Sequence, residues 1–246
     1  MFGQMAEPAE VAHPYYPLGV DIPHYAANTL PLPVILGSLV GMLGSAMLAT
    51  STLALRFNPS LGKGQLVIFC WFIVCYFVLN HATVASSQNL FAQLWKEYAL
   101  SDSRYLTSDP FMLSVESITV FLWGPLSFLC AVSIVAASPL RHPLQIIMCM
   151  AHLYGVALYY STSLVETHFT GRSHSRPEFL YFWVYYVGFN FPWVVVPAFL
   201  MYDSLKTISR KLRSFEQVKI GLKGYEARNG SAKTAVVSKK AEKKEQ

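Results

Sequence analysis

The chain has 246 residues, of which 53% are apolar and only 13% are charged. Soluble domains carry about 25% charged residues, so this composition is unsuited to a water-exposed surface and excludes a soluble globular protein. The formal net charge of +5 does not indicate a nucleic-acid partner, because 12 of the 19 Lys and Arg residues lie from Lys206 onward, in a tail where aromatic residues are sparse. The sequence therefore predicts an all-α integral membrane protein that contacts the lipid bilayer and no nucleic acid.

The amino-terminal segment, residues 1–32, is rich in proline and aromatic residues. Its prolines exclude a long helix, and we expect it to lie extended on the membrane interface. It also lacks the pattern of a signal peptide, so the first span is expected to serve in targeting. That span, residues 33–55, carries no charge, and its pair Gly37 and Gly41 permits close helix contact, which makes a homodimer possible.

The second apolar run is unusually short. Residues 65–79 form a run of 15 residues, which corresponds to about 22 Å of helix against a hydrocarbon core of about 30 Å. Such a run spans only if Asn80, His81 and Thr83 enter the membrane or the bilayer becomes thinner. We therefore expect a second transmembrane helix that is truncated or irregular.

A polar loop with many aromatic residues follows, residues 86–108, and contains the sequence QLWKEYALSDSRY. Two interpretations remain open. The loop is either an interfacial helix anchored by Trp95 and Tyr98, or the rim of a cavity.

The third span, residues 109–129, begins at Asp109 and carries one carboxylate within its apolar run, Glu116. Helical spacing places Thr119, Val120 and Trp123 on the same face. A carboxylate within a membrane span normally faces the interior of the bundle or a cavity, where it has a function. The alternative is a purely structural acid that hydrogen-bonds a neighbouring helix.

The fourth span, residues 144–165, carries His152, and the fifth, residues 179–201, carries Asn190 and Trp193. An indole that faces inward near a carboxylate can stabilise a carbocation through its ring face without acting as a nucleophile. Spacing alone favours a simpler interpretation, in which Trp193 only packs and Asn190 ties two helices together.

These runs predict a five-transmembrane-helix bundle over residues 33–205 and a basic cytosolic tail over residues 206–246. The tail ends in Lys243-Lys244-Glu245-Gln246, which resembles the dilysine retrieval signal of the endoplasmic reticulum. All four cysteines lie within apolar runs, so we expect neither a disulfide nor a metal site.

Four blocks carry a resemblance to a known family: QLWKEYALSDSRY, SVESITVFLWGPLS, LYGVALYY and YFWVYYVGFNFPW. Their order, spacing and composition resemble the emopamil-binding protein family, the sterol Δ8–Δ7 isomerases of the membrane fold called EXPERA. The resemblance implies a multi-pass protein of the endoplasmic reticulum that moves a ring double bond of a sterol substrate. In that chemistry an acid protonates the alkene, a carbocation forms and a base removes a proton, without cofactor or metal.

The resemblance also implies which residues form the site, because the family's motifs match particular positions of this sequence. Glu116, Asn190 and Trp193 correspond to catalytic positions, and Tyr98, Tyr105 and Thr119 correspond to substrate-binding positions.

The second span departs from the family pattern, in which a His is followed four residues later by Glu and then Gly. Here CWFIVC at 70–75 continues directly into the sequence that follows that motif, so roughly nine residues, the His and the Glu among them, are missing. Either the acid–base chemistry was lost or rebuilt, or a coding segment was skipped. Three hypotheses follow: a sterol isomerase, a non-catalytic sterol- or amine-binding relative, and a scaffold or transport protein.

Overall fold

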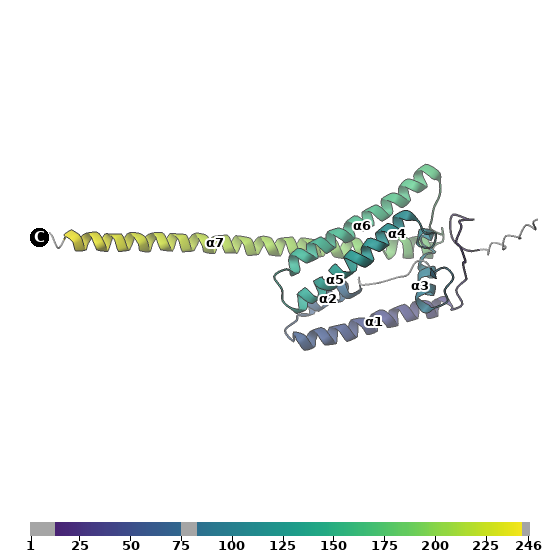
Figure 1. Ribbon diagram of the computed structural model, residues 1–246, viewed down its shortest axis with the longest axis horizontal. Coiled ribbons are helices and arrows are strands. Elements are labelled where there is room, and N and C mark those ends of the chain that lie inside the picture. The colour runs from purple at the N-terminus through teal and green to yellow at the C-terminus, as the bar shows by residue number, and fades with distance from the viewer. Residues whose placement is uncertain (1–12, 75–82, 243–246) are drawn as a thin grey trace, which may run out of the picture. The chain divides into compact units, whose positions relative to one another are not determined.

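The computed structural model describes residues 13–74 and 83–242, with side chains up to residue 228, and the described chain is built from helices. The chain divides into two compact units, Met1–Met201 and Tyr202–Gln246. The first unit holds the packed helices shown in Figure 1.

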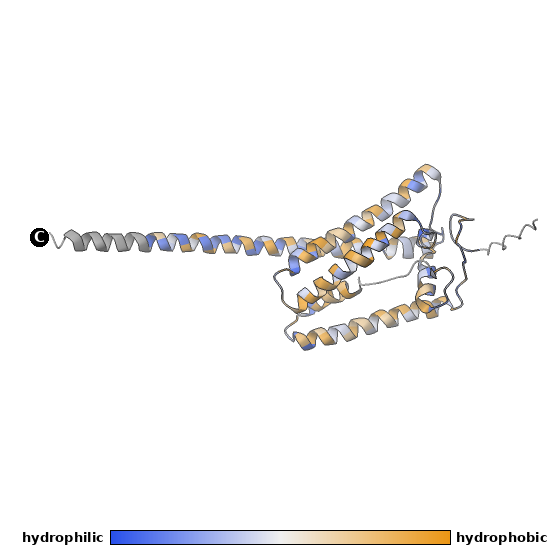
Figure 2. Ribbon diagram, in the orientation of Figure 1, coloured by the Kyte–Doolittle hydropathy of each residue, from blue (hydrophilic) through white to orange (hydrophobic). Residues whose placement is uncertain are grey.

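Four of the described helices are long and apolar enough to cross a membrane: Leu32–Phe57, Pro110–Val135, Arg141–Thr170 and Leu180–Arg228. This confirms the all-α membrane class and makes the chain a multi-pass membrane protein, while the expected number of five spans is not confirmed. Figure 2 shows the apolar residues concentrated along these helices within the first unit.

The helix of the second apolar run, α2 (Lys63–Val74), has 12 residues. The helix is described up to Val74, the last described residue before the gap at 75–82, so the expected truncation of this span lies in part outside the described residues. The helix packs against α1 (Leu32–Phe57) and α5 (Gly124–Val135), and the Ser127 hydroxyl donates a 2.8 Å hydrogen bond to the Phe72 carbonyl. The positions at which the family motif is missing, including His81, lie outside the described residues.

The third span consists of three segments: α4 (Pro110–Ile118), a π-helical segment η3 (Thr119–Trp123) and α5. Asp109 caps α4 by accepting a 2.9 Å hydrogen bond from the Met112 amide, and Pro110 occupies the first helical position, where its missing N–H costs nothing. π-Helical turns inside longer helices are frequent at functional sites. Here the π-helical segment directly follows the turn that carries Glu116.

The fourth span is α6 (Arg141–Thr170), and the fifth comprises a second π-helical segment, η4 (Leu180–Gly188), and the first residues of α7 (Pro192–Glu242). Pro192 breaks the backbone hydrogen-bond ladder between η4 and α7. The Gln145 side chain donates a 3.1 Å hydrogen bond to the Leu200 carbonyl, which joins α6 to this last span.

The loop after α2 forms a short helix, α3 (Leu90–Tyr98), and a 3₁₀ turn, η2 (Ser103–Tyr105). The ammonium of Lys96 is buried and donates hydrogen bonds to the carbonyls of Ala26 (2.7 Å) and Ser87 (2.8 Å). The amino-terminal segment is thereby tied to α3, at the end of the bundle where α1 begins (Figure 1).

Two further expectations from the sequence concern the glycines of α1 and the cysteines of the first unit. Gly37 and Gly41 lie on an exposed face of α1, so the homodimer stays a prediction. Cys70, Cys130 and Cys149 are buried free thiols. In the second unit the described side chains from Lys206 to Arg228 are mostly exposed and include Lys and Arg throughout.

Candidate functional site

A cavity of about 190 Å³ lies among the helices of the first unit, and all six site residues expected from the sequence line it. The six come from different elements: Tyr98 from α3, Tyr105 from η2, Glu116 from α4, Thr119 from η3, and Asn190 and Trp193 from the fifth span. The remaining lining residues are Phe111, Met112, Val115, Trp123, Met148, Ala151, His152, Gly155, Val156 and Tyr159.

Glu116 is the one acidic side chain in this lining. Its carboxyl group has no hydrogen-bond or ion-pair partner among the described residues. Thr119 and Trp123 line the cavity beside it, as helical spacing predicts, but Val120 does not. The reason is η3, whose i→i+5 hydrogen bonding departs from the 3.6-residue period on which the expectation rested.

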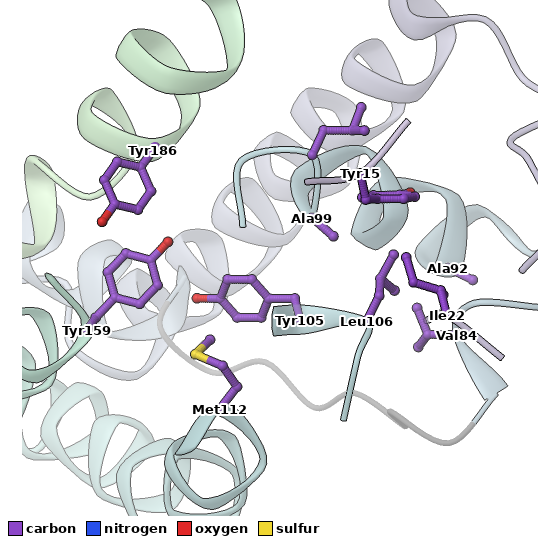
Figure 3. Packing of buried hydrophobic residues seen from close by; sticks show 11 residues of the cluster. Tyr15, Ile22, Val84, Ala92, Ala99, Tyr105, Leu106, Met112, Tyr159 and Tyr186 are labelled. Atoms are coloured by element: carbon purple, nitrogen blue, oxygen red, sulfur yellow. The ribbon is translucent and has the colours of Figure 1, made fainter. Parts of the chain in front are cut away.

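Aromatic residues of the loop after α2 cover one end of the cavity. The rings of Tyr98 and Tyr105 lie 5.1 Å apart, and the Trp95 indole N–H donates a 3.1 Å hydrogen bond to the Tyr105 carbonyl. Figure 3 shows Tyr105 extending toward Tyr159 of α6, with Met112 beside them. Trp95 and Tyr98 therefore face the protein interior, which supports the interpretation of this loop as the rim of a cavity.

Burial raises the pKa of both cavity tyrosines of the loop, Tyr98 and Tyr105, and the nearby charges of Asp102 and Glu116 raise it further. Both phenols thus stay neutral, and because the Tyr105 hydroxyl hydrogen-bonds Tyr98, the Tyr98 hydroxyl is the one that can donate into the cavity.

A buried ion pair holds η2 in place. The Arg104 guanidinium contacts the Asp102 carboxylate at 2.6 Å, donates a 3.1 Å hydrogen bond to the Thr162 hydroxyl and lies 5.3 Å from the centre of the Tyr159 ring. Burial lowers the pKa of Arg104, but the hydrogen bonds and charge of Asp102 outweigh this effect and leave it raised. The guanidinium therefore stays charged, and the pair fixes the loop that carries Tyr105 against α6.

Asn190 makes its hydrogen bond within its own span. Its side-chain amide donates to the Tyr186 carbonyl at 2.8 Å, and the hydroxyl of Tyr160 on α6 donates to the same carbonyl at 2.9 Å. The printed bond of this amide therefore lies within its own span, and the interpretation that Asn190 joins two helices stays a prediction. The interhelical contact at that carbonyl comes from Tyr160.

Three rings form a cluster at the wall of the cavity. The indoles of Trp71 and Trp193 meet edge to face with centroids 4.5 Å apart, while the imidazole of His152 stacks on Trp193 at 6.0 Å and 18°. Trp71 and His152 were not predicted as site residues. For His152 the signal was present, because a histidine inside an apolar span is as costly as a carboxylate. Trp71, one of several aromatic residues in α2, gave no such signal.

An apolar groove of about 500 Å³ adjoins the cavity and shares Tyr98, Asn190 and Trp193 with it. One side of the groove is α1, through Leu36, Leu39 and Leu43, and α3 contributes Glu97. The three shared residues thus form the partition between the cavity and the groove with its apolar wall.

Within residues 13–74 and 83–242, no group of three or more His, Cys, Asp and Glu side chains is arranged to hold a metal ion.

Comparison with known proteins matches residues 90–204 to the EXPERA (EXPanded EBP superfamily) family. The chain is 35% identical over 208 residues to the 3-beta-hydroxysteroid-Delta(8),Delta(7)-isomerase of Mus musculus, covering 80% of this chain and 89% of the relative. It is 30% identical over 210 residues to the probable enzyme of that name from Arabidopsis thaliana, covering 81% and 90%. An isomeliandiol synthase of Melia azedarach is 33% identical over 157 residues, covering 60% and 71%.

Proposed function

This chain belongs to the EXPERA family, and on that premise we propose that it is a 3β-hydroxysteroid Δ8–Δ7 isomerase. The observation that carries the proposal is the cavity in which one carboxyl group, Glu116, is enclosed with aromatic faces and apolar side chains. The names of the relatives from Mus musculus and Arabidopsis thaliana supply the substrate class.

The reaction moves a double bond from between C8 and C9 to between C7 and C8. A proton from Glu116 adds to C9, the π electrons form the new C9–H bond, and C8 becomes a carbocation. Loss of a proton from C7 then returns an electron pair and forms the C7=C8 bond. One proton enters and one leaves, so the residues of the cavity need only hold, deliver and accept protons.

Trp193 is the group that we assign to the cation. Its indole face attracts positive charge electrostatically and does not form a bond to it. The carbonyl oxygen of the Asn190 side chain also remains available, because the amide nitrogen is occupied by Tyr186. A fixed dipole aimed at a developing charge stabilises it without reorganisation.

The substrate reaches this site from the bilayer. Ligand pockets usually measure about 300–1,000 Å³. The cavity of about 190 Å³ is smaller than this, whereas the adjoining groove measures about 500 Å³. We propose that the sterol enters along the apolar groove and that Tyr98 and Trp193, on the partition, move to admit its rings.

The cellular setting belongs to the same proposal. We place the protein in the membrane of the endoplasmic reticulum with its basic carboxyl-terminal tail in the cytosol, because Lys and Arg concentrate on the cytosolic side of membrane proteins. The Lys- and Arg-containing helix after Tyr202 supports this orientation.

A second candidate function has one observation in its favour. The second span lacks the His and Glu of the family pattern, so the cavity has fewer proton-transfer groups than that pattern provides. A non-catalytic member would retain the cavity and bind a sterol or a cationic amine.

One experiment separates the two candidates. The purified chain in lipid nanodiscs is incubated with a Δ8 3β-hydroxysterol, and the Δ7 product is measured. In parallel, binding of an azasterol with a protonated nitrogen in place of C8 is measured. Formation of the Δ7 sterol supports the isomerase. Azasterol binding without the Δ7 product overturns the isomerase in favour of the binding protein. If there is no Δ7 product and no azasterol binding, both candidates are overturned.

A further inference from the structure

His152 lies in the middle of α6 and faces the same cavity as Glu116. Its Nδ1 atom is buried and has no hydrogen-bond partner among the residues that the structure describes. Buried polar atoms nearly always have a partner, so an unpartnered ring nitrogen beside a cavity calls for an explanation by function. A purely structural histidine would be expected to bond a carbonyl or carboxylate of a neighbouring helix.

Two indoles fix the plane of this imidazole. Trp193 stacks on it at 6.0 Å with an interplanar angle of 18°, and Trp71 meets it edge-on at 6.0 Å and 89°. A protonated imidazole over an indole face is stabilised by the same cation–π attraction that stabilises a ligand cation. The ring is therefore oriented by packing, while its Nδ1 atom has no hydrogen-bond partner among the described residues.

We propose that His152 is the second proton-transfer residue of this cavity and accepts the proton that leaves C7 of the sterol. This inference rests on the proposed isomerase function and assigns the role for which the second span has no group. Glu116 donates its proton to C9, the C7–H electron pair forms the C7=C8 bond, and the C7 proton moves to a ring nitrogen of His152. After this step the cavity holds a carboxylate and an imidazolium. Transfer of one proton from His152 to Glu116 restores both groups, so no oxidant, reductant or co-reactant is required.

The test compares His152→Gln with His168→Gln. Both substitutions replace a histidine of α6 by an amide, but His168 is exposed and lies outside the cavity. For His152→Gln we expect kcat to fall on the order of 10²-fold or more, the usual effect of a general acid or base, with KM within about threefold of the unaltered protein. For His168→Gln we expect both constants to stay unchanged.

Azasterol binding and melting temperature serve as the readouts of fold. The inference predicts that His152→Gln still binds the azasterol with an affinity close to that of the unaltered protein. Normal kcat in His152→Gln, or a loss of kcat that is matched by the loss of azasterol binding, overturns the role of His152 and leaves the isomerase function standing. An unaltered protein without isomerase activity overturns the proposed function, and this inference with it.

Discussion

The indole of Trp71 on α2 meets the indole of Trp193 edge to face, with ring centroids 4.5 Å apart and an interplanar angle of 86°. This contact links α2 to the residue that we assign to the carbocation. Aromatic pairs of this geometry contribute about 0.5–1.5 kcal/mol beyond the area that they bury. The described part of the second helix thus contacts a residue of the cavity, although the sequence predicted no site residue within it.

We predict that Trp71→Ala lowers kcat/KM by up to about tenfold, because about 1.4 kcal/mol of lost ring contact leaves Trp193 less well oriented. Trp71→Phe keeps an aromatic edge and should stay within about threefold. Steady-state assays of both variants check this. Equal rates for Trp71→Ala and the unaltered protein would show that the contact does not support the site.

Replacement of Trp193 should affect a cationic ligand more than a neutral one. For Trp193→Leu we expect azasterol affinity to fall by about 10–30-fold, since a desolvated cation–π contact contributes about 2 kcal/mol. Binding of the neutral Δ8 sterol should change several-fold less. Trp183→Leu is the matched control, because Trp183 is exposed and lies outside the cavity lining. An equal loss of affinity for the cationic and the neutral ligand would show that Trp193 only packs.

Removal of one partner of the buried ion pair should destabilise the rim of the cavity. Asp102→Ala leaves the Arg104 guanidinium buried without its carboxylate, which costs about 3–5 kcal/mol. We expect the melting temperature to fall by about 6–12 °C or more. Replacing both residues by apolar ones should cost less than the single change, and a double variant that is less stable than Asp102→Ala would contradict this account.

Glu97 should make stability depend on pH with a defined sign. Burial raises its pKa above the ordinary value of 4.5, and the weaker effects of the Tyr185 hydroxyl and Arg176 do not cancel this shift. In the folded protein the proton is therefore held more tightly than in the unfolded chain, so stability falls as pH rises from about 4.5 through the folded-state pKa. The melting temperature of Glu97→Gln should accordingly rise relative to the unaltered protein across this range.

Glu178 provides the contrast for this measurement. Its hydrogen bonds with Arg176 lower its pKa, so the stability that it contributes is present above pH 4.5 and is lost as pH falls through the lowered pKa. Glu178→Gln should therefore lose stability relative to the unaltered protein as pH rises toward neutrality. If the difference in melting temperature between Glu97→Gln and the unaltered protein were the same at every pH, the assignment for Glu97 would be contradicted.

The sequence predicted the membrane class and the positions of the long helices well, because uncharged runs of twenty or more residues are a strong signal. The residues that meet at the cavity, among them Glu116, Asn190 and Trp193, were accessible through motif resemblance. Their spacing alone left structural alternatives open.

Other features depend on tertiary structure. No periodicity in TVFLW marks Thr119–Trp123 as π-helical, so Val120 was expected at the cavity and is absent from its lining. The buried ammonium of Lys96 is satisfied by carbonyls that are distant in sequence, and a charged residue in a polar loop gave no reason to expect this. The stack of His152 on Trp193 joins two spans, and its geometry depends on how these spans pack.

The measurement that tests the central claim most directly is the rate of Δ8-to-Δ7 conversion by Glu116→Gln in lipid nanodiscs. The unaltered protein and Glu216→Gln, which makes the same change on the exposed carboxyl-terminal helix, are assayed beside it. We predict a loss of rate on the order of 10²–10⁴-fold in Glu116→Gln, because an amide cannot protonate an alkene, and full activity in Glu216→Gln. A rate for Glu116→Gln equal to that of the unaltered protein would contradict the assignment of Glu116 as the proton donor.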